Sequence, residues 1–429
     1  MALLLSREGC RAKRCLWLVN IFVGVGLLSL PYGVRTGGWL SLLILAMVLM
    51  LFCLSGQLII KSLDYMGDRP KSYPQLGIAA VGCHGSKVVG GVALTELFSG
   101  SCVILLVVWQ QLELLLPASP WPNVSSLQFS VICSLVFFLP SLAISNFKRL
   151  SSLSVLGTLS SALVTLAVLG LLPLDPGRRS LPQPPPAHQL VHWSLAQSVG
   201  IFAMATAAHN TLPAMRAAMA KPQRFPAVLS TAFGIMALLY AAVGGIGYWY
   251  YGVQASPLVT TDIATKGAYR ASALPVDTLL AGLVLINCAS KYPAILLVMQ
   301  DLTLGLRGRS AARKPRKAAL FLLRLSMFVA GGALAYTAAN VLGNFISLVG
   351  GLCSMFSSVL MPIGFFSILA WRDLRRCSRA GLVSLLFFGV CLVVSVTYQN
   401  VLRLVHPAAS AENGGAGGIW GYGAAGLLA

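Results

Sequence analysis

The chain has 429 residues, of which 57% are hydrophobic and 10% are charged, and its mean hydropathy is +0.81. An average soluble domain carries about 25% charged residues, so the composition excludes that class and indicates a membrane protein with several spans. A formal net charge of +20 is typical of nucleic-acid binders, but here the basic residues occupy short loops between apolar segments. We therefore expect no nucleic-acid partner.

Eleven apolar segments are long enough to cross the membrane, because one crossing of the hydrocarbon core takes about 20 residues. The first and sixth segments are weaker in hydropathy, since each is interrupted by small and polar residues. The expected spans cover residues 16–36, 39–61, 87–116, 127–146, 150–173, 194–219, 226–252, 274–304, 317–340, 343–371 and 379–402.

The basic residues are distributed unequally between the two sides of these spans. With the N-terminus in the cytosol, the cytosolic segments hold 23 of the 31 Lys and Arg residues and the opposite side holds six. Basic loops stay in the cytosol, so we expect a cytosolic N-terminus and a lumenal or external C-terminus. The sequon at Asn123 then lies on the non-cytosolic side, where glycosylation takes place.

Two of the apolar segments are interrupted by small and polar residues that end in Leu-Pro. The interruptions are GVGLLSLPYG, from Gly24 to Gly33, and ATAAHNTLPA, from Ala205 to Ala214. A broken helix survives in a membrane only where it lines a cavity or faces protein. Paired breaks in two chain halves point to a transporter's substrate site. The first and sixth spans cross in opposite directions, which predicts an inverted repeat of spans 1–5 and 6–10.

This organisation divides the chain into six parts. Two transmembrane repeats of five helices are joined by a Pro-rich linker, and an eleventh helix and a Gly/Ala-rich tail follow. We expect a short basic cytosolic N-terminus at 1–15, the first repeat at 16–173, the non-cytosolic linker at 174–193, the second repeat at 194–371, a cytosolic loop with the eleventh helix at 372–402, and a disordered non-cytosolic tail at 403–429.

The first interruption carries glycines and one hydroxyl that suit ligand binding. Gly24 and Gly26 lack a Cβ atom, so main-chain N–H groups there can approach a ligand closely, and Ser29 adds a polar side chain. Pro31 disrupts the helix behind it, so the half-helix ends present partial charges to a carboxylate or a cation. The alternative is that these glycines serve close helix packing.

The sixth span supplies the polar residues Thr206, His209, Asn210 and Thr211 before Pro213. His209 is the only histidine within an expected span, and an imidazole that titrates near neutrality suits proton coupling or a gate. The alternative is a structural histidine that is hydrogen-bonded to a backbone carbonyl.

Two charged residues, Glu96 and Lys291, lie well inside their spans, where charge is costly and usually functional. Lys291 would either place a fixed ammonium group where a sodium-coupled carrier holds its ion or titrate. Glu96 would be the counter-ion of Lys291 or a proton carrier, and a purely structural ion pair is the alternative. Arg324 lies close to a basic loop, so we expect it to snorkel towards the cytosol.

Several of these segments together resemble the amino acid/auxin permease family, in particular its vacuolar amino-acid transporter and vesicular inhibitory amino-acid transporter branch. The similarity covers roughly residues 17–400. It rests on GVGLLSLPYGVRTGGWL, SYPQLGIAAVG at 72–82, His209-Asn210-Thr211-Leu212-Pro213, Met219-Ala220-Lys221-Pro222 with Arg224-Phe225-Pro226, and Ser290-Lys291-Tyr292.

The resemblance implies an all-α polytopic membrane protein of the leucine-transporter type, with a five-plus-five inverted repeat and an eleventh transmembrane helix. It implies that Ser290 and Lys291 fall where sodium-coupled relatives bind their ion, which favours coupling to protons. By the same resemblance, the residues at the substrate are Gly24, Gly26 and Ser29 in the first span, Phe202, Thr206 and His209 in the sixth, and Glu96 in the third.

We therefore expect a secondary active transporter of amino acids, coupled to protons, that works by alternating access with the substrate at mid-membrane between the two breaks. No spacing among the ten cysteines resembles a metal site, and no catalytic constellation is legible. We expect no cofactor beyond the proton gradient. The expected partners are an amino-acid substrate, protons and the lipid bilayer, for a monomer in the vacuole or another endomembrane. An amino-acid sensor without net transport and a carrier of auxin or another organic anion are the alternatives.

Overall fold

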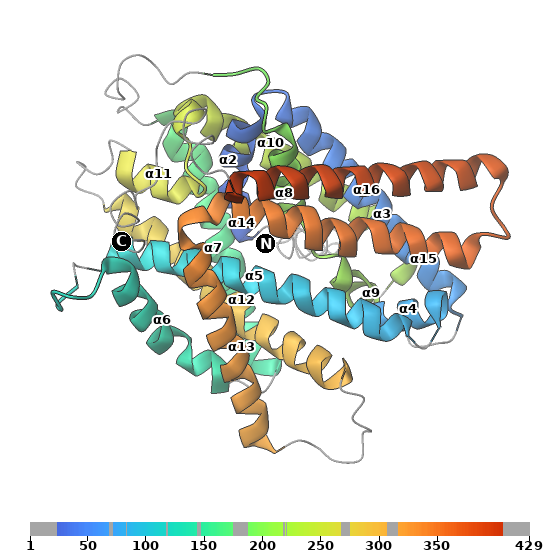
Figure 1. Ribbon diagram of the computed structural model, residues 1–429, viewed down its shortest axis with the longest axis horizontal. Coiled ribbons are helices and arrows are strands. Elements are labelled where there is room, and N and C mark those ends of the chain that lie inside the picture. Colours follow the sequence, from blue (N-terminus) through green and yellow to red (C-terminus); the bar gives the residue numbers. More distant parts are fainter. Residues whose placement is uncertain are drawn as a thin grey trace, which may run out of the picture.

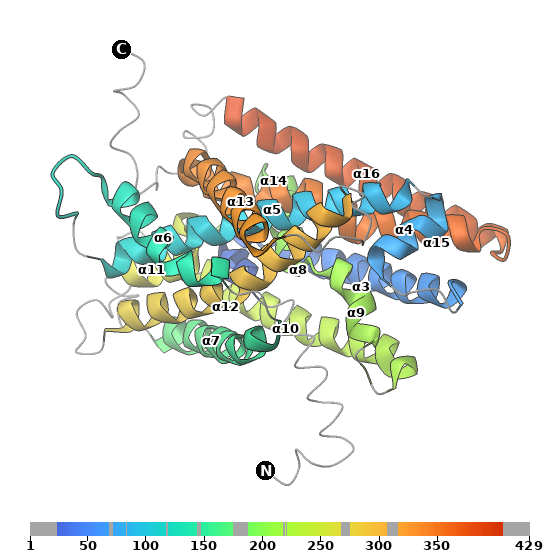
Figure 2. The same ribbon diagram turned by 90° about the horizontal axis from the view of Figure 1, so that it is seen from below.

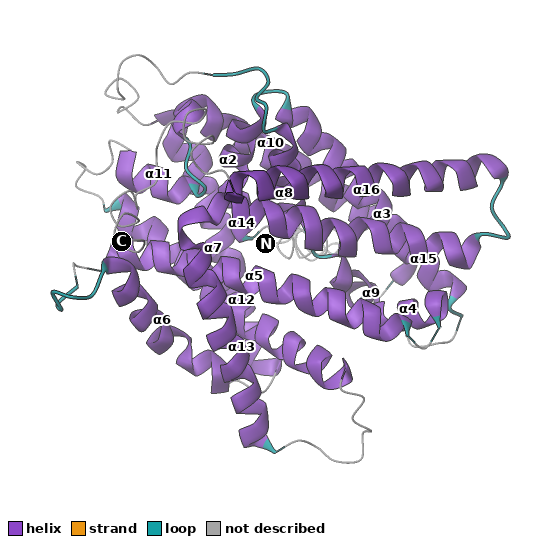
Figure 3. Ribbon diagram, viewed as in Figure 1, coloured by secondary structure: helices purple, strands orange, loops and turns teal. Residues whose placement is uncertain are grey.

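The computed structural model describes residues 24–67, 72–82, 84–116, 119–143, 147–174, 188–217, 219, 221–266, 275–306 and 316–405. All regular elements within these ranges are helices (Figure 3). The expected N-terminal segment 1–15, most of the linker 174–193 and the tail beyond residue 405 lie outside the described residues.

In the first half of the chain, helical segments occupy the expected spans wherever the structure describes them. An additional short helix, α4, lies between the second and third spans. The elements are η2 (Val25–Ser29), α2 (Leu30–Gly37), α3 (Ser41–Tyr65), α4 (Tyr73–Val81), α5 (Gly85–Leu115), α6 (Ser126–Ala143) and α7 (Phe147–Leu174).

The second half begins with α8 (Leu195–Thr206), η4 (His209–Thr211), α9 (Leu212–Ala217), η5 (Pro222–Arg224), α10 (Phe225–Tyr251), η6 (Gly252–Gln254), α11 (Val259–Lys266) and α12 (Val276–Leu306). It continues with α13 (Lys317–Ala338), η8 (Ala339–Val341), α14 (Leu342–Leu348), η9 (Val349–Ser354), η10 (Phe356–Leu360), α15 (Met361–Ala370) and α16 (Arg376–Val405). Below, helix 1 denotes η2 with α2, helix 6 denotes α8, η4 and α9, and helix 10 denotes the run from α14 to α15.

The outer surface of the bundle is apolar, as a lipid-facing surface requires. Large side chains such as Leu43, Leu238 and Phe387 are exposed by 68%, 76% and 72%. Seven helical stretches in the described part are long and apolar enough to cross a membrane. One of them, Lys317–Ala370, has 54 residues, which at about 1.5 Å per residue is enough for two crossings. The chain is a multi-pass membrane protein.

The helices form two packed groups, and each group contains two helices from the first half of the chain and the two corresponding helices from the second half. In one group α2, α3, α8 and α10 pack against one another, and in the other α5, α6, α12 and α13 do so. The long helices α5 and α12 pack together through the middle of the molecule, and α12 also packs against α7. Figure 1 shows α4, α9 and the adjoining ends of α3 and α15 at one end of the bundle, with α11 at the other. The cavity described below lies where the two groups meet.

Helix α16 lies on the outside of the bundle, at the opposite edge from α7 (Figure 2). Only 17% of its most apolar stretch is buried. Its last turn is nevertheless bound to the start of α8, because the Arg403 guanidinium donates hydrogen bonds to the Ser194 hydroxyl and the Gln197 side-chain oxygen. The same guanidinium lies over the Trp193 ring, 4.7 Å from its centroid. The eleventh helix is therefore tied to helix 6.

The expectation that Arg324 snorkels to the membrane surface is wrong. The residue is 4% exposed, and its Nε donates to Gln300 Oε1 at 2.7 Å. One of its terminal nitrogens donates to the Leu142 carbonyl oxygen at 2.9 Å. Arg324 thereby joins α13 to α12 and to α6, and its charge is satisfied inside the scaffold because neighbouring helices provide acceptors.

Replacement of Arg324 should destabilise the α5–α6–α12–α13 group without removing the cavity. In Arg324→Met the Gln300 side chain and the Leu142 carbonyl lose their donor, a loss of about 1–3 kcal/mol for each buried polar group left unpaired. We expect a lower midpoint of thermal unfolding in detergent, measured by intrinsic fluorescence. The exposed Arg376 provides the control Arg376→Met, and equal midpoints for the two variants would contradict the structural role.

Candidate functional site

Helix 1 is unwound where the sequence predicts its break. Gly24 is extended, with φ −138° and ψ −150°, and the following turn η2 is a 3₁₀ helix rather than an α-helix. The regular helix α2 starts only at Leu30 and has Pro31 in its first turn. A proline is tolerated there because the first N–H groups of a helix have no intrahelical partner.

Helix 6 is broken at the corresponding place. The first part, α8, ends at Thr206, and Ala207 has the extended angles φ −75° and ψ 117°. A single 3₁₀ turn, η4, follows at residues 209–211, and a second α-helix, α9, begins at Leu212. The unwound residues 207–208 leave main-chain groups that must be paired by protein, water or a ligand.

The two breaks lie directly against each other. A Cβ atom built on Gly26 would come within 2.5 Å of the Ala205 Cα atom, so only glycine permits this approach of the two main chains. About two turns further along helix 1, a Cβ on Gly33 would lie 2.5 Å from Cε1 of Phe202. Helices 1 and 6 are thus in backbone-to-backbone contact at one end of the site.

A cavity of about 180 Å³ lies beside this contact. One water molecule needs about 10–15 Å³ of such space, so the cavity has room for a ligand the size of an amino acid. Its wall is built from both breaks, α5, α12 and helix 10. The residues that line it are Gly24, Gly26, Ser29, Glu96, Leu97, Gly100, Val103, Ile104, Met204, Ala205, Ala207, Ala208, Asn210, Lys291, Ile295, Ile346 and Ser354.

Ser29 is the polar side chain of the cavity wall that most directly indicates a ligand. It is 1% exposed, and its hydroxyl has no hydrogen-bond partner within the part of the chain that the structure describes. A buried hydroxyl without a partner costs roughly 1–3 kcal/mol. A ligand or an ordered water in the cavity would satisfy it.

Glu96 and Lys291 bring opposite charges to the same cavity from α5 and α12. They do not form an ion pair with each other, because the ion pairs among the described residues are Arg216–Asp64 and Lys266–Asp262. Glu96 is 9% exposed, and its Oε2 accepts a long hydrogen bond of 3.5 Å from Asn210 Nδ2. Both residues therefore line the cavity without neutralising each other's charge.

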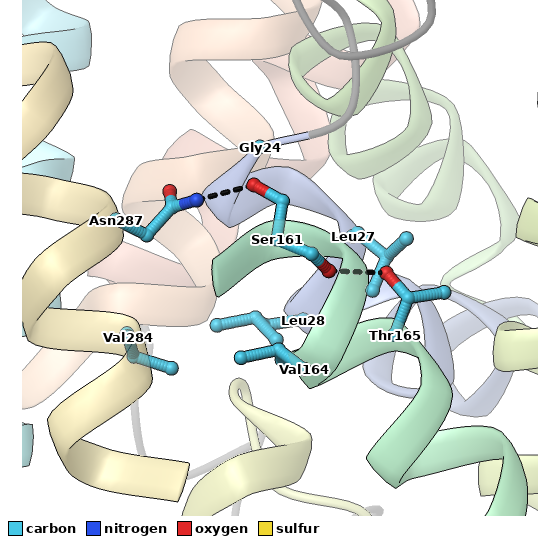
Figure 4. Close-up of a pocket in the computed structure, with 8 residues that line it drawn as sticks. All are labelled: Gly24, Leu27, Leu28, Ser161, Val164, Thr165, Val284 and Asn287. Carbon is cyan, nitrogen blue, oxygen red and sulfur yellow. Dashed lines mark hydrogen bonds between the residues drawn. The ribbon is translucent and has the colours of Figure 1, made fainter. Parts of the chain in front are cut away.

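A second, smaller cavity of about 20 Å³ lies on the other side of the helix 1 break. Figure 4 shows Gly24 at its edge, with Ser161 of α7 and Asn287 of α12 facing each other. Asn287 donates to the Ser161 hydroxyl and to the Gly157 carbonyl oxygen, the latter at 3.0 Å. Gly24 is shared by the two cavities, so the unwound main chain is the partition between them.

His209 does not point into the larger cavity. It is 1% exposed, and its Nε2 lies 2.7 Å from the Phe52 carbonyl oxygen and 3.2 Å from the Ser55 hydroxyl. Its ring packs edge-on against Phe52, at 5.3 Å between centroids. The geometry corresponds to the structural alternative, a histidine bonded to a backbone carbonyl, with α3 as the helix that provides it.

Three other expected site residues also have their side chains outside the cavity lining. Phe202 packs against Gly33, and the Thr206 hydroxyl donates to the Phe202 carbonyl at 2.7 Å within α8. Ser290 donates to the Asn287 carbonyl at 2.7 Å and contacts Gly157 of α7. The structure therefore brings together Gly24, Gly26, Ser29, Glu96 and Lys291, but not these three or His209.

Two further polar residues line the cavity wall: Asn210, which the sequence offers among the polar residues before Pro213, and Ser354, which is not predicted. Asn210 follows His209 in a 3₁₀ turn, where successive side chains point about 120° apart, so one faces α3 and the other the cavity. A sequence reading of that turn could have selected either. Ser354 lies within SLVGGLCSMFSS, where nothing distinguishes one serine from the next.

With this geometry in view, comparison with known proteins gives the family. The sequence matches the family described as transmembrane amino acid transporter protein over residues 12–402. The chain belongs to that family. Membership confirms the resemblance to the amino acid/auxin permeases, and the protein is a membrane transporter of amino acids.

Individual relatives support the same assignment over most of the chain. The chain is 26% identical to Amino acid transporter AVT1J of Arabidopsis thaliana over 398 residues, which is 91% of this chain and 90% of the relative. It is 27% identical to Amino acid transporter AVT1B of the same plant over 402 residues, or 90% of this chain and 70% of that one.

A solved structure confirms the fold of this family member. The manganese transporter of Eremococcus coleocola superposes with a TM-score of 0.52 at 14% identity, over 92% of this chain and 86% of that chain. At this identity the likeness shows the fold alone. The fold is of the leucine-transporter type that the sequence predicts.

The contact between the two breaks can be tested by adding a single methyl group. In Gly26→Ala the new Cβ meets the Ala205 main chain at 2.5 Å, so helix 1 or helix 6 must shift, at a cost of about 1–3 kcal/mol. We expect loss of transport and a lower unfolding midpoint.

The control is Gly100→Ala, on the opposite wall of the same cavity. Its Cβ would have Met204 Cε as the nearest atom, at 3.8 Å, which is ordinary contact. Amino-acid uptake into proteoliposomes should survive in Gly100→Ala and fail in Gly26→Ala; similar uptake in both would refute the close approach.

Proposed function

We propose that this protein is a proton-coupled secondary transporter of neutral amino acids that works by alternating access. The substrate binds at mid-membrane between the breaks of helices 1 and 6, and the group formed by α2, α3, α8 and α10 moves against the group formed by α5, α6, α12 and α13. The observation that carries the proposal is the cavity at the two breaks, which holds the unpaired Ser29 hydroxyl, a carboxylate and an ammonium group.

The main chain around the cavity supports recognition of a zwitterion. The first N–H groups of η2, at Val25 and Gly26, lie at a helix N-terminus, where a carboxylate is favoured. Ser29 adds a hydroxyl donor on the same wall. The C-terminal end of α8, at Thr206, has carbonyl groups that favour an ammonium group. The α-carboxylate and α-amino group of an amino acid match these two ends.

The rest of the wall supports an uncharged side chain on the substrate. It is formed mainly by aliphatic groups, which give dispersion contacts but no partner for a charge. These groups come from Leu97, Val103, Ile104, Ile295 and Ile346. A charged substrate side chain that lies against this aliphatic part of the wall would lose its hydration without gaining a counter-charge there.

The ionisable groups support coupling to protons rather than to sodium. Lys291 is already a cation on α12, at the position where the family resemblance places the bound ion of sodium-coupled relatives. Repulsion between this ammonium group and a second cation disfavours a sodium ion there. Glu96 is the carboxylate of the cavity wall and is the proposed proton carrier.

The distribution of basic residues supports a cytosolic position for the end of the bundle that holds α4 and α9. Figure 1 shows α4, α9 and the adjoining ends of α3 and α15 there. Basic residues in or next to these elements are Lys61, Arg216, Arg224 and Arg372, in agreement with the preference of basic loops for the cytosol. We propose an endomembrane such as the vacuole as the location, with the α11 end facing the lumen. The protein acts as a monomer in this proposal.

The decisive experiment is transport by the purified full-length protein in proteoliposomes. Counterflow of a panel of labelled amino acids, with and without a pH gradient and with and without sodium, should show exchange of neutral amino acids and acceleration by the pH gradient. Binding without flux would instead indicate a sensor, and competition by indole acids would indicate an auxin carrier. Uptake that follows sodium alone would contradict proton coupling.

Lys291 provides a sharper test of the coupling. Lys291→Ala removes the fixed cation from the cavity, so transport should lose its dependence on pH, whereas Lys291→Arg keeps the charge and should keep binding while coupling is impaired. The measurement is initial uptake as a function of external pH. Lys87→Ala, at an exposed position at the start of α5, serves as the control. An unchanged pH profile in Lys291→Ala would show that the Lys291 ammonium does not take the place of a bound ion.

A further inference from the structure

A group of hydroxyls lies between the cavity and the short helix α4. Glu96 is eleven residues from the start of α5 at Gly85, which is about 16 Å along the helix, so its carboxylate is distant from the loop. Two serines of helix 10, Ser354 and Ser357, lie in segments that pack against α5, and the Ser357 hydroxyl donates to the Ser354 carbonyl oxygen at 3.4 Å. Ser354 also lines the cavity, whereas Ser357 does not. The two serines therefore extend polar character from the cavity towards α4.

The main chain that holds these serines is unusual. Residues Val349–Ser354 and Phe356–Leu360 form two π-helical segments, and such segments are rare and often mark functional sites. The segment is fixed against helix 6, because a Cβ on Gly350 would come within 1.8 Å of the Gly200 carbonyl oxygen. Ser354 and Ser357 are buried, with exposures of 0% and 1%. The wide turn of helix 10 thus keeps two buried hydroxyls beside α5, the helix that carries Glu96.

Tyr73 lies next to this group of hydroxyls, on the side of α4. It is the first residue of α4, it is 3% exposed, and its hydroxyl donates to the Ser357 carbonyl oxygen. Its ring packs edge-on against Phe365 at 6.3 Å between centroids. The preceding residue, Ser72, is exposed. Tyr73 therefore links Ser357 to the start of α4, next to an exposed residue.

The ionisable groups that face Glu96 come from three elements. Tyr73 on α4 is hydrogen-bonded to the Ser357 carbonyl oxygen, Cys353 precedes Ser354 in helix 10, and Lys291 on α12 lines the same cavity as Glu96. Asn210 of helix 6 contributes a neutral donor. A hydroxyl both donates and accepts, so Ser354 and Ser357 can pass on a proton, which the surrounding aliphatic side chains cannot do.

We propose that Glu96 exchanges its proton with solvent at the α4 end of the bundle through Ser354 and Ser357, and that Tyr73 is the gate of this route. The Glu96 carboxyl group gives up one proton, each hydroxyl accepts one proton and releases another, and a water molecule beyond Tyr73 receives the last one. Glu96 is left as a carboxylate, and no other bond forms or breaks. The inference rests on the proposed proton coupling and adds the path and the gate.

Ser357→Ala tests the path, because Ser357 is hydrogen-bonded to Ser354 but does not line the cavity. Two measurements are made on proteoliposomes of the full-length protein, with the neutral amino acid that the wild type exchanges fastest. Counterflow at equal pH reports binding and alternating access, and a pH-sensitive dye reports proton flux driven by the substrate. Ser357→Ala should keep counterflow within about twofold and lower proton flux by at least about tenfold.

The matched control is Ser367→Ala, which removes a buried hydroxyl from the same helix that bonds only to the Ile363 carbonyl, at 2.7 Å. It should leave both measurements unchanged. Wild-type proton flux in Ser357→Ala, or an equal fall of flux and counterflow, would overturn the route. A wild type that exchanges amino acids without moving protons would instead overturn the proposed coupling itself.

The gate is tested by two substitutions of Tyr73. Tyr73→Ala removes the ring and should raise proton leak in the absence of substrate by several-fold, whereas Tyr73→Phe keeps the ring and should leak less than Tyr73→Ala. Retained counterflow shows that a variant is folded. Equal leak in Tyr73→Ala, Tyr73→Phe and the wild type would remove Tyr73 from the mechanism and leave the role of Ser357 to its own test.

Discussion

The absence of water from the hydrocarbon core governs this structure, because every main-chain N–H and C=O inside it needs a partner. Helices 1 and 6 both break this rule locally, at Gly24 and at residues 207–208. The molecule accommodates the two breaks by placing them against each other and around a cavity. The main-chain groups left unpaired at the breaks are therefore the same groups that are available to bind a ligand in the cavity.

Close approach of main chains keeps the two breaks in register. Gly26 permits contact with Ala205, and Gly200 and Gly350 permit contact between helix 6 and helix 10. Small residues give such contacts their strength in a membrane, since packing rather than the hydrophobic effect drives helix association there. Three elements from distant parts of the chain thus meet within a few residues of the site, and a side chain added at any of these glycines would separate them.

The sequence predicts the breaks, the fold class and the two charges of the cavity, because each has a strong physical cost in a membrane that leaves a visible signal. Gly24, Gly26, Ser29, Glu96 and Lys291 do meet at one cavity. The direction in which a side chain points is harder to predict than its position along the helix. His209 and Asn210 are adjacent, yet one bonds to α3 and the other reaches Glu96, and only the local 3₁₀ geometry decides between them.

Other features could not be read from the sequence because they depend on neighbours far away in the chain. Arg324 is buried rather than exposed because Gln300 and Leu142 offer it acceptors. Ser290 faces α7 because Gly157 leaves room for it. The π-helical part of helix 10 has no proline or polar break to announce it. In each case the deciding contact joins residues that no local pattern relates.

The bond between Arg403 and the start of α8 has a consequence for motion. Helix α16 lies outside both packed groups with most of its surface towards lipid, but its last turn is attached to helix 6 through Ser194 and Gln197. Any displacement of α8 must either break these bonds or carry α16 along. In the second case a whole helix is dragged through the bilayer at each cycle, so the viscosity and thickness of the surrounding membrane become part of the resistance that the transporter works against.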